Sequence, residues 1–189
     1  MTTPRLATAR LLMREWQDSD WEPYAQLNAD PEVMRHFPSV LTPEQSAEMI
    51  VRMAAAWVER GFGLWAVERT DTGEFIGFVG LSAPSWHASF TPCIEVGWRL
   101  AKQHWGSGFA PEAAIAALEW GFANVDLPDD QIVSFTTVSN VNSRRVMEKI
   151  GMVHDPACDF DHPLLPDWSE RRHVLYRISR RQFAERVAR

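Results

Sequence analysis

The sequence predicts an α+β fold with a central, mixed and mostly antiparallel sheet flanked by helices. Two apolar runs at residues 63–69 and 75–81 are separated by the turn-forming segment Thr70-Asp71-Thr72-Gly73-Glu74, which indicates a β-hairpin. Residues 94–100 alternate apolar and other side chains with period two, as a half-buried strand does. A glycine turn and an alanine-rich helix follow that strand, so strands and helices are interleaved along the chain.

Capping residues predict two helices before the hairpin. Asp18-Ser19-Asp20 is expected to cap a helix that runs through Leu27. Thr42-Pro43-Glu44-Gln45 has the pattern of a capping box and predicts a longer helix that ends at about Arg60. The helices therefore precede the hairpin in the chain.

The second half of the chain continues with helices and strands in alternation. The small side chains between residues 113 and 123 predict a helix that packs closely on a sheet. Residues 131–138 are rich in β-branched side chains and predict a strand. Asn142 and Ser143 are expected to cap a helix that ends near Gly151, and residues 171–179 to form the last strand.

Residues 103–112 combine a strand exit, a glycine turn and a helix start. Gly106 and Gly108 let the backbone approach a ligand without a Cβ in the way, and successive N–H groups can point at one anion. Pro111 suits the first helical turn, and Glu112 opposes the positive end of the helix dipole. This turn is therefore predicted to bind phosphate at a helix N-terminus.

The spacing of the turn excludes the common nucleotide motifs. A P-loop requires four residues between its glycines and then Lys-Ser or Lys-Thr, which do not follow Gly106. A dinucleotide-binding turn places a small residue where this chain has Pro111, and it begins directly after a strand. A glycine turn that only joins a strand to a helix is the alternative at this point.

Composition predicts one compact domain spanning residues 1–189, with 46% hydrophobic residues to build its core. Cys93 and Cys158 are too few for a disulfide framework, and no basic leader or long apolar run occurs, so we expect a cytoplasmic protein without a membrane segment. Acidic residues outnumber basic ones by 25 to 19, which disfavours general nucleic-acid binding. The arginines between residues 171 and 189 belong either to a solvated strand and helix or to a patch facing RNA or protein.

Two motifs carry a resemblance to a known family. Gln103-x-x-Gly106-x-Gly108 resembles the acetyl-CoA signature Gln/Arg-x-x-Gly-x-Gly/Ala of the GNAT superfamily of N-acetyltransferases. Residues 140–152 resemble the Asn-x-x-Ser-x-x-Val-x-Glu-Lys-x-Gly-Phe segment of the ribosomal-protein N-terminal acetyltransferase (RimJ/RimL) branch, and residues 6–14 resemble that branch's first strand. The resemblance covers nearly the whole chain, from about residue 5 to about residue 178.

The resemblance implies the GNAT fold, in which the strands before and after the phosphate turn splay apart around the pantetheine arm of acetyl-CoA. Amides of the glycine turn are expected to bind the pyrophosphate, and strand residues to pair with the pantetheine. A homodimer is also implied, and no metal is expected. The implied cofactor-binding residues are Trp98, Leu100, Gln103, Trp105, Gly106, Ser107, Gly108, Phe109, Ala110, Asn140 and Ser143.

Glu95 is the candidate acid/base residue, because a carboxylate on the strand leading to the cofactor can deprotonate an ammonium. The alternatives are that Glu95 is a structural hydrogen-bond acceptor or that it only orients the acceptor. Ser143 matches the family's serine near the sulfur and can relay a proton to the thiolate, or it is only a helix cap. Many superfamily members use a tyrosine on this helix, but none occurs between Asn140 and Gly151, which leaves Ser143, water or Glu95 as the acid.

The loop of residues 155–163 carries three carboxylates and a histidine and is a candidate acceptor site. Asp161 and its neighbouring carboxylates would attract a cationic amine, and His162 could accept a proton. The alternatives are a solvated loop or a metal held by Asp159, Asp161 and His162. Trp86 could form a wall of the same pocket, or it belongs to the core.

These observations predict an acetyl-CoA-dependent N-acetyltransferase that transfers acetyl directly to a primary amine. The branch resemblance favours a protein or peptide N-terminus as the acceptor. A small-molecule amine is the alternative, because one fold serves many acceptors. A non-catalytic acyl-CoA sensor would keep the glycine turn without needing Glu95, and a nucleotide-dependent oxidoreductase is supported by the turn alone.

Overall fold

A computed structural model describes residues 3–188, and these form two compact units. Of the described residues, the first unit comprises 3–81 and 97–117, and the second comprises 82–96 and 118–188. Strands of both units are mainly antiparallel, and helices flank them, which confirms the predicted α+β class with a mixed sheet. The assignment of residues 1–189 to one domain stays a prediction.

The first unit carries strands in the order β1-β2-β3-β4-β5, and the first three neighbouring pairs are antiparallel. The predicted hairpin is confirmed, since its strands pair from Leu64↔Gly80 onward. Gly77, with φ of 136°, lies in β4 where a Cβ would overlap the Arg99 carbonyl. The strands are β1 (Leu6–Ala7), β2 (Leu11–Arg14), β3 (Leu64–Arg69), β4 (Phe75–Ser82) and β5 (Glu95–Leu100).

The single first strand predicted for residues 6–14 is wrong. The segment folds back on itself as β1 and β2, with Leu6 paired to Met13. The Thr8 side chain closes the turn, because its hydroxyl accepts a hydrogen bond from the Leu11 amide at 3.0 Å. A side chain that bonds locally to the backbone competes with continuation of the strand.

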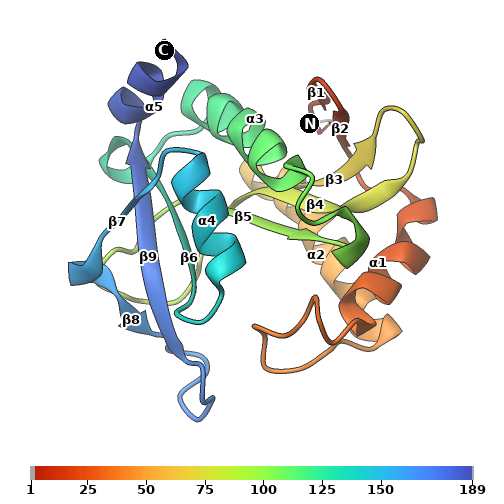
Figure 1. Ribbon diagram of the computed structural model, residues 1–189, viewed down its shortest axis with the longest axis horizontal. Helices are drawn as coiled ribbons and strands as arrows, with labels where there is room; N and C mark the ends of the chain where they lie inside the picture. Colours follow the sequence, from red (N-terminus) through yellow and green to blue (C-terminus); the bar gives the residue numbers. More distant parts are fainter. Residues whose placement is uncertain (1–2, 189) are drawn as a thin grey trace. The chain divides into compact units, whose positions relative to one another are not determined.

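Helices α1 (Trp21–Ala29) and α2 (Pro43–Arg60) pack against each other in the first unit (Figure 1). The capping box of α2 is confirmed, since Thr42 and Gln45 exchange hydrogen bonds of 2.9 and 3.2 Å. The predicted cap of α1 is wrong, because the segment Asp18–Asp20 forms a 3-10 turn and the Asp20 carboxylate binds Arg14 instead. Buried side chains of this unit's core are Tyr24, Leu27, Val33, Ile50, Met53 and Phe78.

The second unit continues the strand order as β5-β6-β9-β7, with β8 also paired to β9. The two strands predicted at residues 131–138 and 171–179 are confirmed as an antiparallel pair that is in register along its whole length. β5 and β6 are parallel, with Glu95 paired to Val133. The strands are β6 (Gln131–Thr137), β7 (Val153–His154), β8 (Phe160–Asp161) and β9 (Arg172–Ser179), and the two-residue strands β7 and β8 were not predicted.

Helix α3 (Phe109–Asn124) begins in the first unit and ends in the second, and α4 (Val141–Lys149) and α5 (Arg180–Val187) belong to the second. The predicted cap of α4 at residues 142–143 is wrong. Asn140 is the N-cap, and its side-chain oxygen accepts a hydrogen bond from the Ser143 amide at 3.2 Å. Short 3-10 turns also occur at Lys102–His104, Pro128–Asp130 and Pro156–Cys158.

Of the C-terminal arginines, Arg172 and Arg177 lie on β9 and Arg180, Arg181 and Arg186 lie on α5 (Arg180–Val187), whereas Arg171 precedes β9. Their guanidinium groups are held by partners within the second unit, and Arg189 lies outside the described residues. The partners are Asp161 for Arg171 and Arg172, Asp155 for Arg177, Asp130 for Arg180, Glu185 for Arg181 and the Lys149 carbonyl for Arg186. Across residues 3–188, no helix combines the length and apolar character that a membrane crossing requires.

Candidate active site

The glycine turn presents unpaired backbone amides to solvent. Gly106 and Gly108 have φ of 76° and 81°, in the left-handed region that glycine adopts without strain. Within the described residues, the amides of the segment 106–110 donate no hydrogen bond, and the first bond of α3 runs from the Glu112 amide to the Gly108 carbonyl. Pro111 falls in the first turn of α3, as predicted. Free amides at a helix N-terminus suit a phosphate group.

Glu112 forms hydrogen bonds that hold the glycine turn to the β1–β2 segment of the same unit. Its carboxylate accepts hydrogen bonds from the Thr8 hydroxyl at 2.6 Å, the Arg10 amide at 2.9 Å and Arg10 Nε at 2.7 Å. Arg10 Nη1 in turn donates to the Ser107 carbonyl at 2.9 Å. Partial burial favours the neutral acid, but these hydrogen bonds outweigh it and lower the pKa of Glu112. The sequence predicts Glu112 at this helix start but not its partners Thr8 and Arg10.

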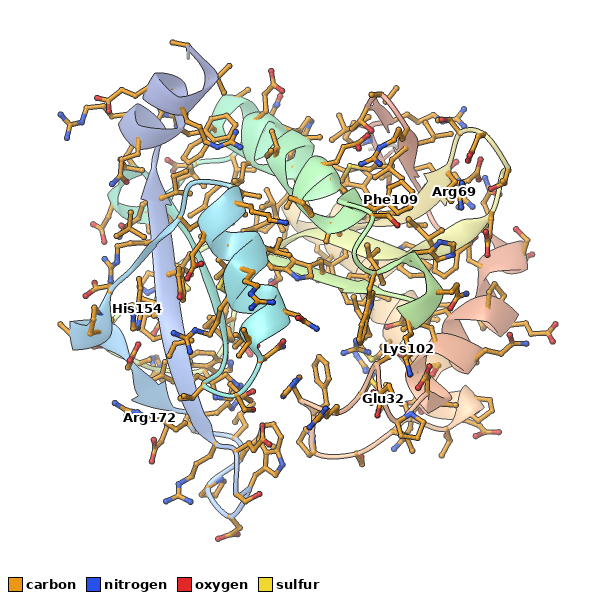
Figure 2. All side chains as sticks on the ribbon, in the orientation of Figure 1. Glu32, Arg69, Lys102, Phe109, His154 and Arg172 are labelled. Atoms are coloured by element: carbon orange, nitrogen blue, oxygen red, sulfur yellow. The ribbon has the colours of Figure 1, made fainter. Side chains whose placement is uncertain are left out.

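Two arginines lie beside the turn, over the ring of the buried Phe109. The guanidinium carbon of Arg10 is 4.6 Å from the ring centroid, and that of Arg69 is 5.5 Å away. Figure 2 shows Arg69 and Phe109 near one another at the start of α3. Arg10 pairs with Glu112 and Arg69 with Asp71, each at 2.6 Å, so their positive charge at the turn is partly offset. Neither arginine belongs to the signature motif, which explains why sequence reasoning missed them.

The other predicted cofactor residues of the first unit lie around the end of β5. The Trp105 indole donates to the Leu100 carbonyl at 2.7 Å, so the structure brings these two residues together. Gln103 lies on the wall of a pocket of about 530 Å³, at the 3-10 turn after β5. Trp98 is half-buried on β5.

Glu95, the predicted acid/base residue, lies at the start of β5 in the second unit. Burial raises its pKa to about 7, and a hydrogen bond from the Ser82 hydroxyl at 3.0 Å opposes that shift. Ser82 is its only hydrogen-bond partner among the described residues. Burial together with the Glu95 charge also raises the pKa of the nearby Cys93 thiol to about 12. A carboxyl group of this kind exchanges its proton near neutral pH.

Aromatic side chains line the face of the second unit's sheet that carries Glu95. Glu95 is in register with Val133, and Phe135 follows on the same face because side chains alternate along a strand. Trp86 packs against Phe135 with ring centroids 5.5 Å apart and lies 5.1 Å from His162. The structure therefore brings the predicted acceptor residues Trp86 and His162 together. Burial and the neighbouring His173 lower the pKa of His162, which favours its neutral form.

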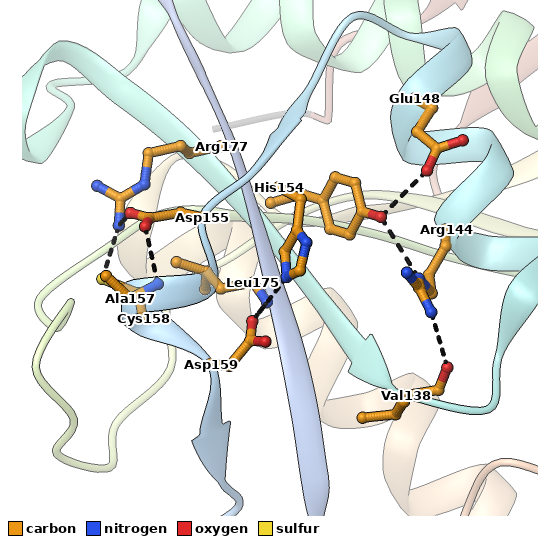
Figure 3. A network of polar contacts seen from close by, with 11 residues as sticks. Val138, Arg144, Glu148, His154, Asp155, Ala157, Cys158, Asp159, Leu175 and Arg177 are labelled. Atoms are coloured by element: carbon orange, nitrogen blue, oxygen red, sulfur yellow. Dashed lines mark hydrogen bonds and ion pairs between the residues drawn. The ribbon is translucent and has the colours of Figure 1, made fainter.

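The carboxylates of the loop at residues 155–163 all have side-chain partners, which are arginines for Asp155 and Asp161 and a histidine for Asp159. Asp161 binds Arg171 and Arg172 at 3.2 and 3.3 Å. Asp155 pairs with Arg177 at 2.7 Å, and Asp159 pairs with His154 at 2.9 Å (Figure 3). These ion pairs offset the negative charge that the sequence places here. Within residues 3–188, no three His, Cys, Asp or Glu side chains gather as a metal would require.

Ser143 lies on the opposite face of this sheet. Asn140, which caps its helix, donates from its side-chain nitrogen to the Thr136 hydroxyl at 2.9 Å. On α4, Glu148 accepts a hydrogen bond from the Tyr176 hydroxyl at 3.2 Å (Figure 3). Thr136 alternates with Phe135 along β6, so α4 covers the face away from Glu95. The Ser143 hydroxyl has no hydrogen-bond partner among the described residues, which leaves it available to a ligand.

Comparison with known proteins defines the class of this fold and site. Residues 10–153 match the acetyltransferase (GNAT) domain family. The chain is 33% identical over 150 residues to the uncharacterized N-acetyltransferase YoaA of Bacillus subtilis, covering 78% of this chain and 82% of that protein. It is 29% identical over 187 residues to the FsC-acetyl coenzyme A-N(2)-transacetylase of Aspergillus fumigatus, covering 95% of this chain and 78% of that protein.

A solved structure agrees with these sequence relatives. The acetyltransferase from Agrobacterium tumefaciens superposes with a TM-score of 0.76 at 28% identity, covering 95% of this chain and 96% of that one. The fold is that of an acetyltransferase. The chain belongs to the GNAT family of N-acetyltransferases, which use acetyl-CoA as the acetyl donor. The predicted fold and enzyme class are thereby confirmed.

Proposed function

We propose that this enzyme transfers acetyl directly from acetyl-CoA to the amino terminus of a peptide or protein, with Glu95 as the general base. The observation that carries the proposal is the placement of the Glu95 carboxyl group at the start of the strand that leads to the glycine turn, with the Ser82 hydroxyl as its described partner. Burial raises its pKa to about 7. A base is most effective when its pKa lies near the working pH. Glu95 has no cation to hold it in the charged form, since Ser82 is its only described hydrogen-bond partner.

The residues of the glycine turn fit the diphosphate of acetyl-CoA. Its unpaired amides supply the donors, and Arg10 and Arg69, each paired with an acidic neighbour, lie beside them. A Cβ built on Gly106 meets no atom within 4 Å, so the backbone is open to a ligand there. We assign pyrophosphate binding to the amides from Gly106 to Ala110, and we assign contacts with the rest of the cofactor to Trp98, Leu100, Gln103 and Trp105.

The proposed reaction is a single displacement. The acceptor nitrogen attacks the thioester carbonyl carbon, the N–C bond forms, and the C–S bond breaks. Glu95 takes the proton that the acceptor ammonium loses, directly or through one water. A backbone N–H of β5 polarises the carbonyl oxygen, and water protonates the departing thiolate, because Ser143 lies on the face of the sheet away from Glu95. Asn140 fixes the start of the helix that carries Ser143.

The acceptor is proposed from the sequence of residues 140–152, which resembles the ribosomal-protein N-terminal acetyltransferase branch. We assign its binding to Glu95 and to Trp86 and His162, whose rings lie 5.1 Å apart. Asp161 is assigned to the rim of the same surface. Its charge is offset by Arg171 and Arg172, so aromatic contact outweighs cation attraction in this assignment.

The test is a panel of peptides with free N-termini and small amines, incubated with acetyl-CoA while thiol release and product mass are measured. The proposal expects acetylated peptides and release of one thiol for each. Acetylation of small amines alone would contradict the peptide acceptor and identify a small-molecule enzyme. Binding of CoA without thiol release across the panel would identify a sensor module. Failure to bind CoA would contradict the whole assignment.

A further inference from the structure

Arg99, on β5 of the first unit, is a buried cation without a carboxylate partner. Its residue exposure is 9%, and burial lowers its pKa. Its hydrogen bond runs from Nη1 to the neutral side-chain oxygen of Asn28 at 2.6 Å. Burying a charge is costly unless an opposite charge or several hydrogen bonds compensate it. The one neutral partner of Arg99 therefore does not compensate the cost of burying its charge.

The unused edge of Arg99 is the edge that recognises carboxylates. Among the described residues, Nε is buried and has no partner, and Nη2 makes no hydrogen bond. These two nitrogens form a planar fork whose parallel N–H groups match the two oxygens of a carboxylate. Nη1 is on the other edge, where Asn28 holds it. Asn28 thus orients the fork, whose Nε is shielded from solvent and has no described partner.

Aromatic rings cover the faces of the same guanidinium. The ring centroid of Phe37 is 4.2 Å from its central carbon, and that of Phe78 is 5.5 Å away. Phe78 is buried, whereas Phe37 is 38% exposed in the segment between α1 and α2. These cation–π contacts stabilise the buried charge in part but supply no hydrogen-bond acceptor. An exposed ring can move aside more easily than a buried one.

Arg14, a second buried arginine of the same unit, has its charge compensated by carboxylates. Its Nη1 and Nη2 donate to the two Asp20 oxygens at 2.7 and 2.8 Å, and Nε donates to Glu68 at 2.8 Å. Two carboxylates therefore compensate Arg14 from within the chain. Among the described residues Arg99 has no such group, which leaves its charge available to a ligand.

We propose that Arg99 is an anion subsite that binds a carboxylate of the acceptor through its Nε and Nη2 fork. This inference rests on the proposed function, and it names the acceptor class: an amine that also bears a carboxylate, such as a peptide with an acidic side chain. Glu95 and Arg99 occupy alternate positions of β5, and side chains at such positions face the same way. The strand thus offers a base for the amine and a cation for the carboxylate.

The first test compares matched acceptors that differ only in charge. Peptides with Glu or Asp are paired with the Gln or Asn peptides, all amidated at the C-terminus, and short amino acids are paired with their amides. The wild-type enzyme should prefer each carboxylate member by about 10- to 100-fold in kcat/KM, the value of a charged hydrogen bond. Arg99→Gln should remove that preference through KM, while the neutral members change less than about twofold.

Two controls separate a binding role from a folding role. Arg99→Lys keeps the charge but loses the planar fork, so it should fold and retain only part of the preference. Arg52→Gln removes an exposed arginine of α2 that pairs with Glu48 at 3.7 Å, and it should leave the preference unchanged. Equal loss on both members of every pair in Arg99→Lys would overturn the inference, as would a wild type that favours neutral acceptors.

A second test does not depend on turnover. The side-chain Nε–H resonance of Arg99, assigned by its absence in Arg99→Gln, is followed by NMR while sodium acetate is added against sodium chloride. A saturable shift with acetate supports the subsite even if no acceptor is acetylated, in which case the proposed function alone fails. No shift with acetate or with any carboxylate-bearing peptide would overturn the subsite, whereas acetylation of neutral amines would leave the proposed function intact.

Discussion

Two glutamates lie at the two parts of the proposed site, and their surroundings are opposite. Glu112, at the glycine turn, accepts hydrogen bonds from Thr8 and Arg10, which lower its pKa. Glu95, at the start of β5, has the Ser82 hydroxyl as its described partner, and burial raises its pKa to about 7. Glu112 is thus kept charged, whereas Glu95 is close to half-protonated near neutral pH.

The difference distinguishes a positioning carboxylate from a reacting one. A carboxylate that fixes backbone must stay ionised and fully hydrogen-bonded, because loss of charge would release its partners. A carboxylate that takes a proton must have a pKa near the working pH, and desolvation without a cation achieves this. We therefore expect substitutions at Glu95 to affect turnover and substitutions at Glu112 to affect cofactor binding.

Glu95→Gln should have the largest effect on activity. The amide has nearly the same shape but cannot accept a proton, so kcat should fall by about 100-fold or more. The affinity for CoA should change less than about twofold, because Glu95 is not part of the glycine turn. Steady-state kinetics and calorimetric titration with CoA measure the two quantities. Equal kcat in the variant would remove Glu95 from the chemistry.

The same variant should be more stable than the wild type above neutral pH. The folded-state pKa of Glu95 is raised, so its contribution to stability is present below about pH 4.5 and is lost as the pH rises through about 7. At pH 8 the wild type buries a charge that the amide lacks, and Glu95→Gln should gain about 1–3 kcal/mol in the free energy of unfolding. Urea denaturation at pH 5 and pH 8 should show the gain only at pH 8.

Gly108→Val should be next in effect and should act on the cofactor. Gly108 has φ of 81°, and a Cβ there lies 3.4 Å from Arg10 Nη2, so a branched side chain strains the turn and displaces the arginine. Affinity for CoA should fall by at least about tenfold as the amides lose their alignment. Gly73→Ala is the matched control, because Gly73 has φ of 70° in the β3–β4 turn and its Cβ would meet no atom within 4 Å. Equal CoA affinity of Gly108→Val and the control would contradict the assigned pyrophosphate site.

Glu112→Gln should have a smaller effect on both cofactor binding and stability. The amide cannot hold Thr8 and Arg10 together as the carboxylate does, so CoA affinity should fall by about two- to fivefold and stability by about 1 kcal/mol at pH 7. Since the folded-state pKa of Glu112 is lowered, its contribution is present above the usual value of 4.5 and is lost as the pH falls through the lowered pKa. Wild type and variant should therefore converge in stability in acid, and a difference that persists there would point to packing instead.

Ser82→Ala should have the smallest effect and should act through Glu95. The serine hydroxyl lowers the pKa of Glu95 against the effect of burial, so its removal should raise that pKa further. The acidic limb of the pH–rate profile should move upward by less than about one pH unit, with kcat at high pH little changed. Ser85→Ala, a substitution in the following loop, serves as the control. A limb that stays in place would show that Ser82 does not act on the titrating group.

Sequence reasoning identified the elements whose signals are local. The capping box at Thr42 and the glycine turn at Gly106 both have the predicted form, because each depends on residues within a few positions. The first strand was mispredicted because the Thr8 hydroxyl bonds to the Leu11 amide and turns the chain. Nothing in the residue types of positions 6–14 distinguishes that turn from an extended strand.

The charge environment of the site depends on distant partners and could not be predicted. The Thr8 hydroxyl bonds to Glu112, which is more than a hundred positions away in the sequence. Arg99 of β5 bonds to Asn28 of α1. The carboxylates of the loop at residues 155–163 formed a negative cluster in the sequence, but arginines of β9 and its flank offset them. Residue type predicted which groups carry charge, whereas only the fold determines which charges are compensated.

The pH dependence of kcat/KM tests the central claim, that Glu95 is the general base, most directly. The wild type should lose activity as the pH falls through about 7, with a slope of one on a logarithmic plot, because protonated Glu95 cannot accept a proton. Glu95→Gln should be slow at every pH and should lack that limb, measured with an acceptor whose own pKa is known. A wild-type profile without a transition near neutral pH, or a variant that keeps the same limb, would contradict the account.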